Sequence, residues 1–207
     1  MSKNVPTKLL LAVLLCLTAH ARGFAQAGAG KQEKKQKTKV ETNYDESKGE
    51  TTARIGPLEL FKPPKNSVSG EMDYEQVDMT VAFSYPGKRI AKPKSVTLMV
   101  FAASERGARF EKRRDLSIKT DSGTYDLGEM ELVGKGEGHL PKRIGGAGVF
   151  VVREIVRKSI PFDEFASIAK SERAEMKIGS RKFKLEKSQL VAFRNFVSLM
   201  EQEGLEF

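Results

Sequence analysis

The feature that most constrains this fold is an alternation of apolar and polar residues. Apolar side chains occupy every second position from Val77 to Tyr85, and Pro86-Gly87 follows directly. A period of two is typical of a strand with one face in a core, and Pro-Gly supplies the chemistry of a turn. The alternation therefore predicts a fold rich in β-strands.

Three further segments are predicted to form strands. Residues 96–103 (VTLMVFAA) are apolar on both faces, which predicts a central strand covered on both sides. Residues 116–127 alternate around Asp-Ser-Gly and predict a hairpin. A third apolar run, 149–156, follows Gly148 and predicts another strand.

The segment 174–185 (AEMKIGSRKFKL) predicts a tight hairpin. Gly179-Ser180 suits a two-residue type II′ turn, which needs a positive φ at its first central position. Two of the resulting cross-strand pairs are apolar, one is of opposite charge, and one is a like-charge pair that disfavours the register. In order, the pairs are Met176 with Phe183, Ala174 with Leu185, Glu175 with Lys184, and Lys177 with Lys182.

Two helices are predicted late in the chain. Residues 162–169 place apolar side chains at helical spacing, and Pro161 suits the first turn of that helix. Residues 188–203 form an amphipathic pattern that predicts a C-terminal helix lying over a sheet. The predicted class is α+β, mostly β, with an antiparallel β-sandwich-like body, one short helix and the C-terminal helix.

The N-terminus has the pattern of a secretory signal peptide. Lysines precede the nine-residue apolar run 9–17, which is too short to span a bilayer. Ala25-Gln26-Ala27 fits the cleavage pattern, and we expect cleavage after Ala27. Two alternatives are a lipoprotein signal with Cys16 as the lipidated residue, which Leu15 disfavours, and an uncleaved amphipathic helix.

We therefore divide the chain into a signal peptide, 1–27, a disordered Lys-rich linker, 28–41, and a single β-rich globular domain, 42–207. Cleavage removes Cys16, the only cysteine, so the mature chain has no disulfide and no thiolate site. It also leaves no predicted transmembrane anchor.

The formal charge of +9 is concentrated near the N-terminus. Three basic residues lie in the signal peptide, and residues 31–39 carry five lysines against one glutamate. Residues 40–207 are nearly balanced, with 28 basic against 26 acidic residues. A domain so balanced is not expected to bind nucleic acid. The lysine run is either a solvated linker or a flexible polycation that touches anionic envelope surfaces.

The glycine-rich stretch 134–148 invites a phosphate-binding interpretation, but its spacing does not support one. A P-loop needs Ser or Thr after Gly134-Lys135, and a dinucleotide fingerprint needs glycine where His139 stands. We expect a mobile loop between strands, with a ligand-contacting loop as the alternative. His139 is the only histidine after Ala27, and a single histidine is too few for a metal site. We predict no metal site, no cofactor and no catalytic residue.

The densest basic cluster of the domain is ERGARFEKRRD, residues 105–115. Its arginines Arg106, Arg109, Arg113 and Arg114 are the predicted binding residues, because guanidinium groups hold anionic ligands or acidic protein surfaces. The alternative is a solvated loop, or an edge strand whose charges block edge-to-edge pairing.

A pattern of apolar residues and glycines accompanies these features. It comprises Tyr44, Thr51-Thr52, Phe83-Ser84-Tyr85, Gly87, Ile160, Phe162, Phe165, Ile168-Ala169, Glu175, Ile178-Gly179, Phe183, Leu185 and Leu190. In this pattern residues 42–203 resemble uncharacterised exported bacterial proteins with a signal peptide and a β-rich domain. The resemblance implies export and a β-rich fold, and it brings neither a known function nor a catalytic residue.

These observations favour an exported, periplasmic or secreted, non-enzymatic binding module of the bacterial cell envelope. Its expected partner is an envelope protein or an anionic envelope surface. One alternative is a structural or assembly accessory that uses a sheet edge or the C-terminal helix, which an exposed apolar stripe on 188–203 would favour. The other is a hydrolase, which a deep pocket lined by carboxylates or His139 would favour.

Overall fold

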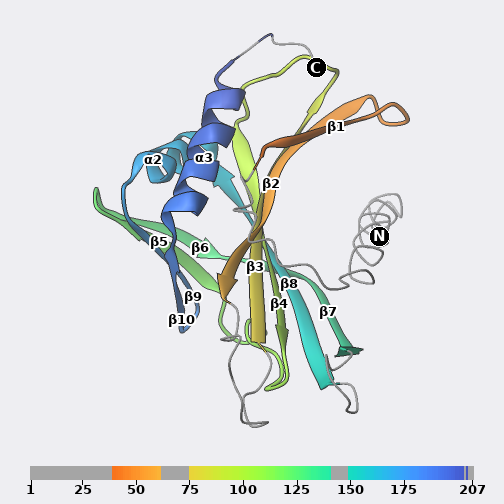
Figure 1. Ribbon diagram of the computed structural model, residues 1–207, viewed down its shortest axis with the longest axis vertical. Helices are drawn as coiled ribbons and strands as arrows, with labels where there is room; N and C mark the ends of the chain where they lie inside the picture. The colour runs from red at the N-terminus through yellow and green to blue at the C-terminus, as the bar shows by residue number, and fades with distance from the viewer. Residues whose placement is uncertain (1–38, 62–74, 141–148, 203, 205–207) are drawn as a thin grey trace, which may run out of the picture. The chain divides into compact units, whose positions relative to one another are not determined.

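The computed structural model of the protein describes residues 39–61, 75–140, 149–202 and 204. All of them belong to one compact unit, 37–207. The described residues are mostly β and form two antiparallel sheets and two helices (Figure 1). The predicted class is confirmed.

The larger sheet has six strands in the order β1-β2-β3-β4-β8-β7. Every neighbouring pair is antiparallel. Its strands are β1 (Glu41–Asp45), β2 (Glu50–Phe61), β3 (Glu75–Pro86), β4 (Ser95–Ser104), β7 (Glu131–Leu140) and β8 (Val149–Pro161).

The smaller sheet has four strands in the order β10-β9-β5-β6. Its strands are β5 (Asp115–Thr120), β6 (Thr124–Glu129), β9 (Ala174–Ile178) and β10 (Arg181–Leu185). The predicted hairpin 174–185 is confirmed in all four cross-strand pairs, and Gly179 has the required positive φ of +57°.

The helices are α2 (Phe162–Lys170) and α3 (Lys187–Met200). Pro161 is the N-cap of α2 and so precedes the first turn in which it was expected. Glu186 and Gln189 form a capping box at the start of α3, and the Gln189 amide also donates to the Glu59 carbonyl of β2. No helix in the part of the chain that the structure describes is long and apolar enough to cross a membrane.

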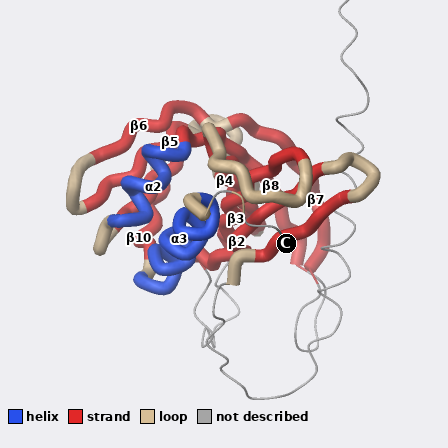
Figure 2. Tube along the Cα trace, turned by 90° about the horizontal axis from the view of Figure 1, so that it is seen from above, coloured by secondary structure: helices blue, strands red, loops and turns tan. Residues whose placement is uncertain are grey.

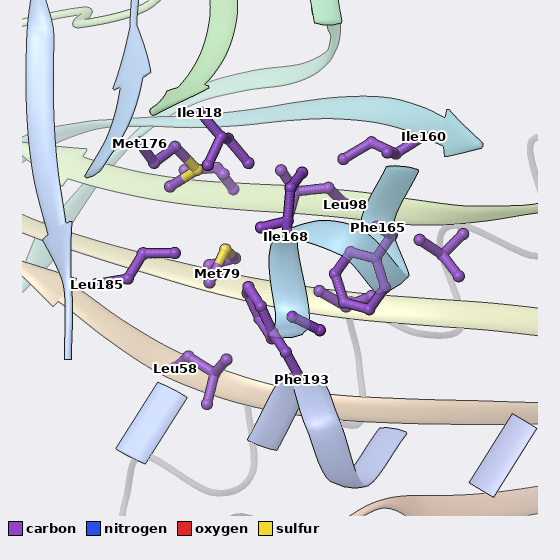
Figure 3. Packing of buried hydrophobic residues seen from close by; sticks show 14 of the residues in the cluster. Leu58, Met79, Leu98, Ile118, Ile160, Phe165, Ile168, Met176, Leu185 and Phe193 are labelled. Atoms are coloured by element: carbon purple, nitrogen blue, oxygen red, sulfur yellow. The ribbon is translucent and has the colours of Figure 1, made fainter. Parts of the chain in front are cut away.

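The core lies on one face of the six-stranded sheet. Met79 and Leu98 on that face belong to the same buried cluster as Met176 of the smaller sheet (Figure 3). The helices contribute aromatic side chains to it, and Phe165 of α2 lies 5.0 Å from Phe193 of α3 between ring centroids. Figure 2 shows the two helices side by side. This cluster fixes where the two sheets and both helices lie relative to one another.

Two sequence predictions need correction. Residues 96–103 do lie in a central strand, but its second face, which includes Met99 and Phe101, is only half-buried. Residues 134–140 belong to strand β7 and pair with β8, so this part of the glycine-rich stretch is not a loop. Its outer part, 141–148, lies outside the described residues.

The N-terminal predictions fall largely outside the described residues. The signal peptide and most of the linker, through residue 38, are not covered. The last linker residues are ordered, because Val40 packs against the core and Glu41 begins β1. The described fold thus starts slightly before residue 42.

Candidate functional site

The predicted arginines lie on the segment that connects β4 to β5, residues 105–114, which we call the basic loop. It links a strand of the larger sheet to a strand of the smaller one. The Phe110 side chain is 1% exposed and belongs to the core, so it anchors the middle of the loop. Arginines on both sides of Phe110 are thereby held at the protein surface.

A buried carboxylate fixes the loop backbone at the same place. Glu154 of β8 is 2% exposed. Its carboxylate accepts the backbone N–H of Arg109 and that of Phe110, the latter at 3.0 and 3.2 Å. Hydrogen bonds to a charged acceptor are stronger than neutral ones. The buried carboxyl group of Glu154 thus holds two consecutive peptide units of the loop.

The Arg109 side chain binds within the protein. Its Nε lies 3.2 Å from the Glu75 carboxylate at the start of β3, and Arg181 of β10 reaches the same oxygen at 2.9 Å. Glu75 and Arg109 have side-chain exposures of 12% and 20%. Glu75 therefore joins the larger sheet, the basic loop and the smaller sheet through one carboxylate.

The Arg114 guanidinium is also engaged. It donates to the carbonyls of Met130, at 2.8 Å, and Glu111, at 2.7 Å, and pairs with the Glu129 carboxylate at 2.7 Å. These contacts hold the C-terminal end of the loop against the end of β6 and against Met130, which lies between β6 and β7. Arg109 and Arg114 thus shape the loop.

Glu111 has a partner on β7. The Lys135 ammonium lies 2.9 Å from its carboxylate. Hydrogen bonding to Lys135 lowers the pKa of Glu111, and the same contact raises the pKa of Lys135. Both side chains are largely in solvent, where such a pair adds little to stability. Lys135 thus pairs with one of the two acidic residues of the basic loop.

The tip of the β9–β10 hairpin packs on the end of the loop. Gly179 donates its backbone N–H to the Asp115 carbonyl at 2.9 Å. A Cβ at Gly179 would clash with the Arg113 carbonyl oxygen. Only glycine permits this approach, so the hairpin sequence and the loop conformation depend on each other.

Two of the four predicted arginines, Arg106 and Arg113, are exposed, whereas Arg109 and Arg114 are half-buried in the contacts above. The structure brings all four onto one loop but does not converge them on one point. Sequence reasoning missed Glu154 and Glu75. Glu154 could have been noticed in the sequence, because it is the one acidic residue within the apolar run 149–156.

Two surface hollows lie elsewhere. A groove of about 510 Å³ runs between the start of β1 and the end of α3, with Val40 and Leu199 among its lining residues. A second, of about 410 Å³, is lined by Glu131 and Arg157, which pair with each other at 2.7 Å. Both are open depressions, and neither has the features of a binding site for a charged ligand.

Within the described ranges, no group of three or more His, Cys, Asp or Glu side chains is placed to hold a metal ion. His139 pairs through its backbone with Phe150 in the β7–β8 ladder.

The comparisons with known proteins identified no relative. No protein-family model, no curated protein and no solved structure matches this chain.

Proposed function

We propose that this protein is an exported, non-enzymatic binding module of the bacterial cell envelope, and that the basic loop holds an acidic group of a partner envelope protein. The observation that carries the proposal is the buried Glu154 carboxylate, which fixes the loop backbone at Arg109 and Phe110. Binding residues are concentrated on loops that a rigid scaffold positions. Export, to the periplasm or the medium, is inferred from the N-terminal signal pattern.

Arg106 and Arg113 are the residues that we expect to contact the partner. Both are exposed, and they flank the anchored Phe110. A guanidinium presents several N–H donors in a rigid fork that matches a carboxylate. Because the loop is already ordered, the free energy of binding is not reduced by the cost of ordering its backbone.

An assembly accessory that uses α3 is less well supported. The exposed positions of α3 are mainly polar, and they are Lys187, Ser188, Val191, Arg194, Asn195 and Ser198. Val191, 45% exposed, is the only large apolar side chain among them. An isolated apolar side chain is normal on a protein surface and does not form a stripe.

Site-specific photo-cross-linking in the native envelope tests the proposal. A photo-reactive residue at Lys112, exposed on the basic loop, should trap a partner, whereas one at Lys170, exposed at the end of α2, should not. Replacing Arg106 and Arg113 with glutamine should abolish the adduct formed from position 112. Equal adducts from both positions, or an adduct unchanged by the two replacements, would refute it.

A further inference from the structure

The smaller sheet has one buried face and one face covered with lysines. Side chains such as Ile118, Met176 and Phe183 point into the core. The intervening residues of the same strands point the opposite way, because side chains alternate along a strand. Four of these are exposed lysines, which we call the lysine face: Lys119, Lys177, Lys182 and Lys184.

The strand register groups these lysines closely. Lys177 lies directly opposite Lys182, while Glu175 lies between Lys119 and Lys184 on its two neighbouring strands. Directly opposed side chains on a sheet have Cβ atoms about 5 Å apart. Lys182 lies 3.4 Å from the Glu175 carboxylate. Four cations thus surround a single carboxylate on three adjacent strands.

This arrangement is not explained by the stability of the fold. Like charges directly opposite each other in a sheet are destabilising. Among the described residues, Lys119, Lys177 and Lys184 take part in no ion pair. Further acids lie on this side by strand alternation, among them Asp115 of β5 and Asp126 of β6, which lies opposite Ser117. Of the four lysines, only Lys182 is paired, with Glu175, so around that carboxylate positive charges exceed negative ones.

Protection of a sheet edge explains only part of the pattern. Lysines on an edge strand discourage pairing with another chain, and β10 is an edge strand that carries Lys182 and Lys184. Lys119 and Lys177 lie on the interior strands β5 and β9, where no edge needs protection. These two lysines require another reason.

We infer that the lysine face docks on a membrane surface that carries anionic phospholipid headgroups. A sheet face spreads its charges over an area, which suits a plane of phosphates better than a single small anion. The ammonium group is a compact point charge on a flexible stem, so each lysine reaches a separate headgroup. An anionic leaflet attracts clustered lysines near its surface.

The inference goes beyond the proposed function, because it concerns another surface and another class of partner. The basic loop leads directly into β5, but its arginines and the lysine face are different side chains. The two interactions are therefore separable by substitution.

Co-sedimentation with vesicles tests the inference. The background protein is the exported protein in which glutamine replaces the lysines of the N-terminal run, so that this run cannot contribute to binding. The replaced residues are Lys31, Lys34, Lys35, Lys37 and Lys39. This background protein should bind vesicles of equal parts phosphatidylglycerol and phosphatidylcholine at low salt, and should not bind pure phosphatidylcholine. Replacing the lysine face with four glutamines should weaken binding at least about tenfold. Replacing only the interior pair, Lys119 and Lys177, should give an intermediate loss.

The matched control removes four charges elsewhere. Lys88, Arg89, Lys92 and Lys94 are exposed on the segment between β3 and β4, and their replacement with glutamine should change binding less than about twofold. Equal losses in the two variants would show a net-charge effect and overturn the inference. Binding to soluble polyphosphate with the same lysine dependence, but not to vesicles, would overturn it too. Loss of vesicle binding on replacing only Arg106 and Arg113 would assign it to the basic loop, against the inference.

Discussion

The Glu154 carboxylate on β8 accepts the backbone N–H of Phe110 at 3.0 Å, from a position that is 2% exposed. Replacing Glu154 with alanine leaves the N–H groups of Arg109 and Phe110 without this acceptor. We expect a loss of roughly 2–4 kcal/mol in the free energy of unfolding, because buried unsatisfied donors are costly. Glutamine keeps one side-chain oxygen and should lose roughly half as much. Urea unfolding measures both.

The control for Glu154 is Glu137→Ala, which removes an exposed acid from the neighbouring strand β7. It should change the free energy of unfolding by less than about 0.5 kcal/mol. An equally small effect of Glu154→Ala would mean that the loop is held by Phe110 alone.

Replacing Gly179 and Gly136 with alanine should have different effects on the free energy of unfolding. Gly179 has φ +57°, and its Cβ would meet the Arg113 carbonyl, so Gly179→Ala should cost at least about 2 kcal/mol. Gly136 has no atom within 4 Å of its would-be Cβ and no positive φ. Gly136→Ala should be neutral or stabilise by up to about 1 kcal/mol, because alanine restricts the unfolded chain. Thermal unfolding of the two variants decides this, and similar melting temperatures would contradict the packing of the hairpin tip on the loop.

The hairpin around Gly179 shows what the sequence could predict. Its turn chemistry and its apolar pairs are local, so they specify the register of β9 and β10 from twelve residues. The strands β1 and β2 were not predicted, because Thr, Glu and Gly dominate residues 41–56 and mask any alternation. Their position at one side of the larger sheet depends on long-range pairing with β3.

The basic loop could be located from its composition but not interpreted. Glu75, Glu129 and Glu154 come from three other strands, and only the fold places them beside the loop arginines. The lysine face could be predicted only in part: the hairpin register placed Lys177, Lys182 and Lys184, but Lys119 is distant in sequence from them. The sheet order β9-β5 brings the two strands together.

Tyr85 should make stability fall at alkaline pH. Its side chain is 2% exposed, and burial raises the pKa of its hydroxyl above the ordinary value of 10.0. Between the unfolded and folded pKa values the unfolded chain binds fewer protons, so stability decreases as the pH rises. Tyr85→Phe should flatten this decrease above about pH 10 and have little effect at pH 7. Identical slopes of urea midpoint against pH in both proteins would contradict the prediction.

Cleavage of the signal peptide is expected after Ala27, because small residues at positions 25 and 27 follow the apolar run 9–17. N-terminal sequencing of the exported protein should therefore begin at Gly28. A lipid-modified Cys16 at the N-terminus would contradict this and would place the protein on a membrane through an acyl anchor.

Residues 28–38 should be separable from folding. They carry polar and small residues with almost no apolar surface, so deleting them should change the free energy of unfolding by less than about 0.5 kcal/mol. Extending the deletion through Val40 removes a side chain that packs against the core, and should cost about 1 kcal/mol. Urea unfolding of the two truncated proteins locates the start of the folded domain. A large loss from the shorter deletion would show that the lysine run docks on the domain, and equal stability of both would show that Val40 adds nothing.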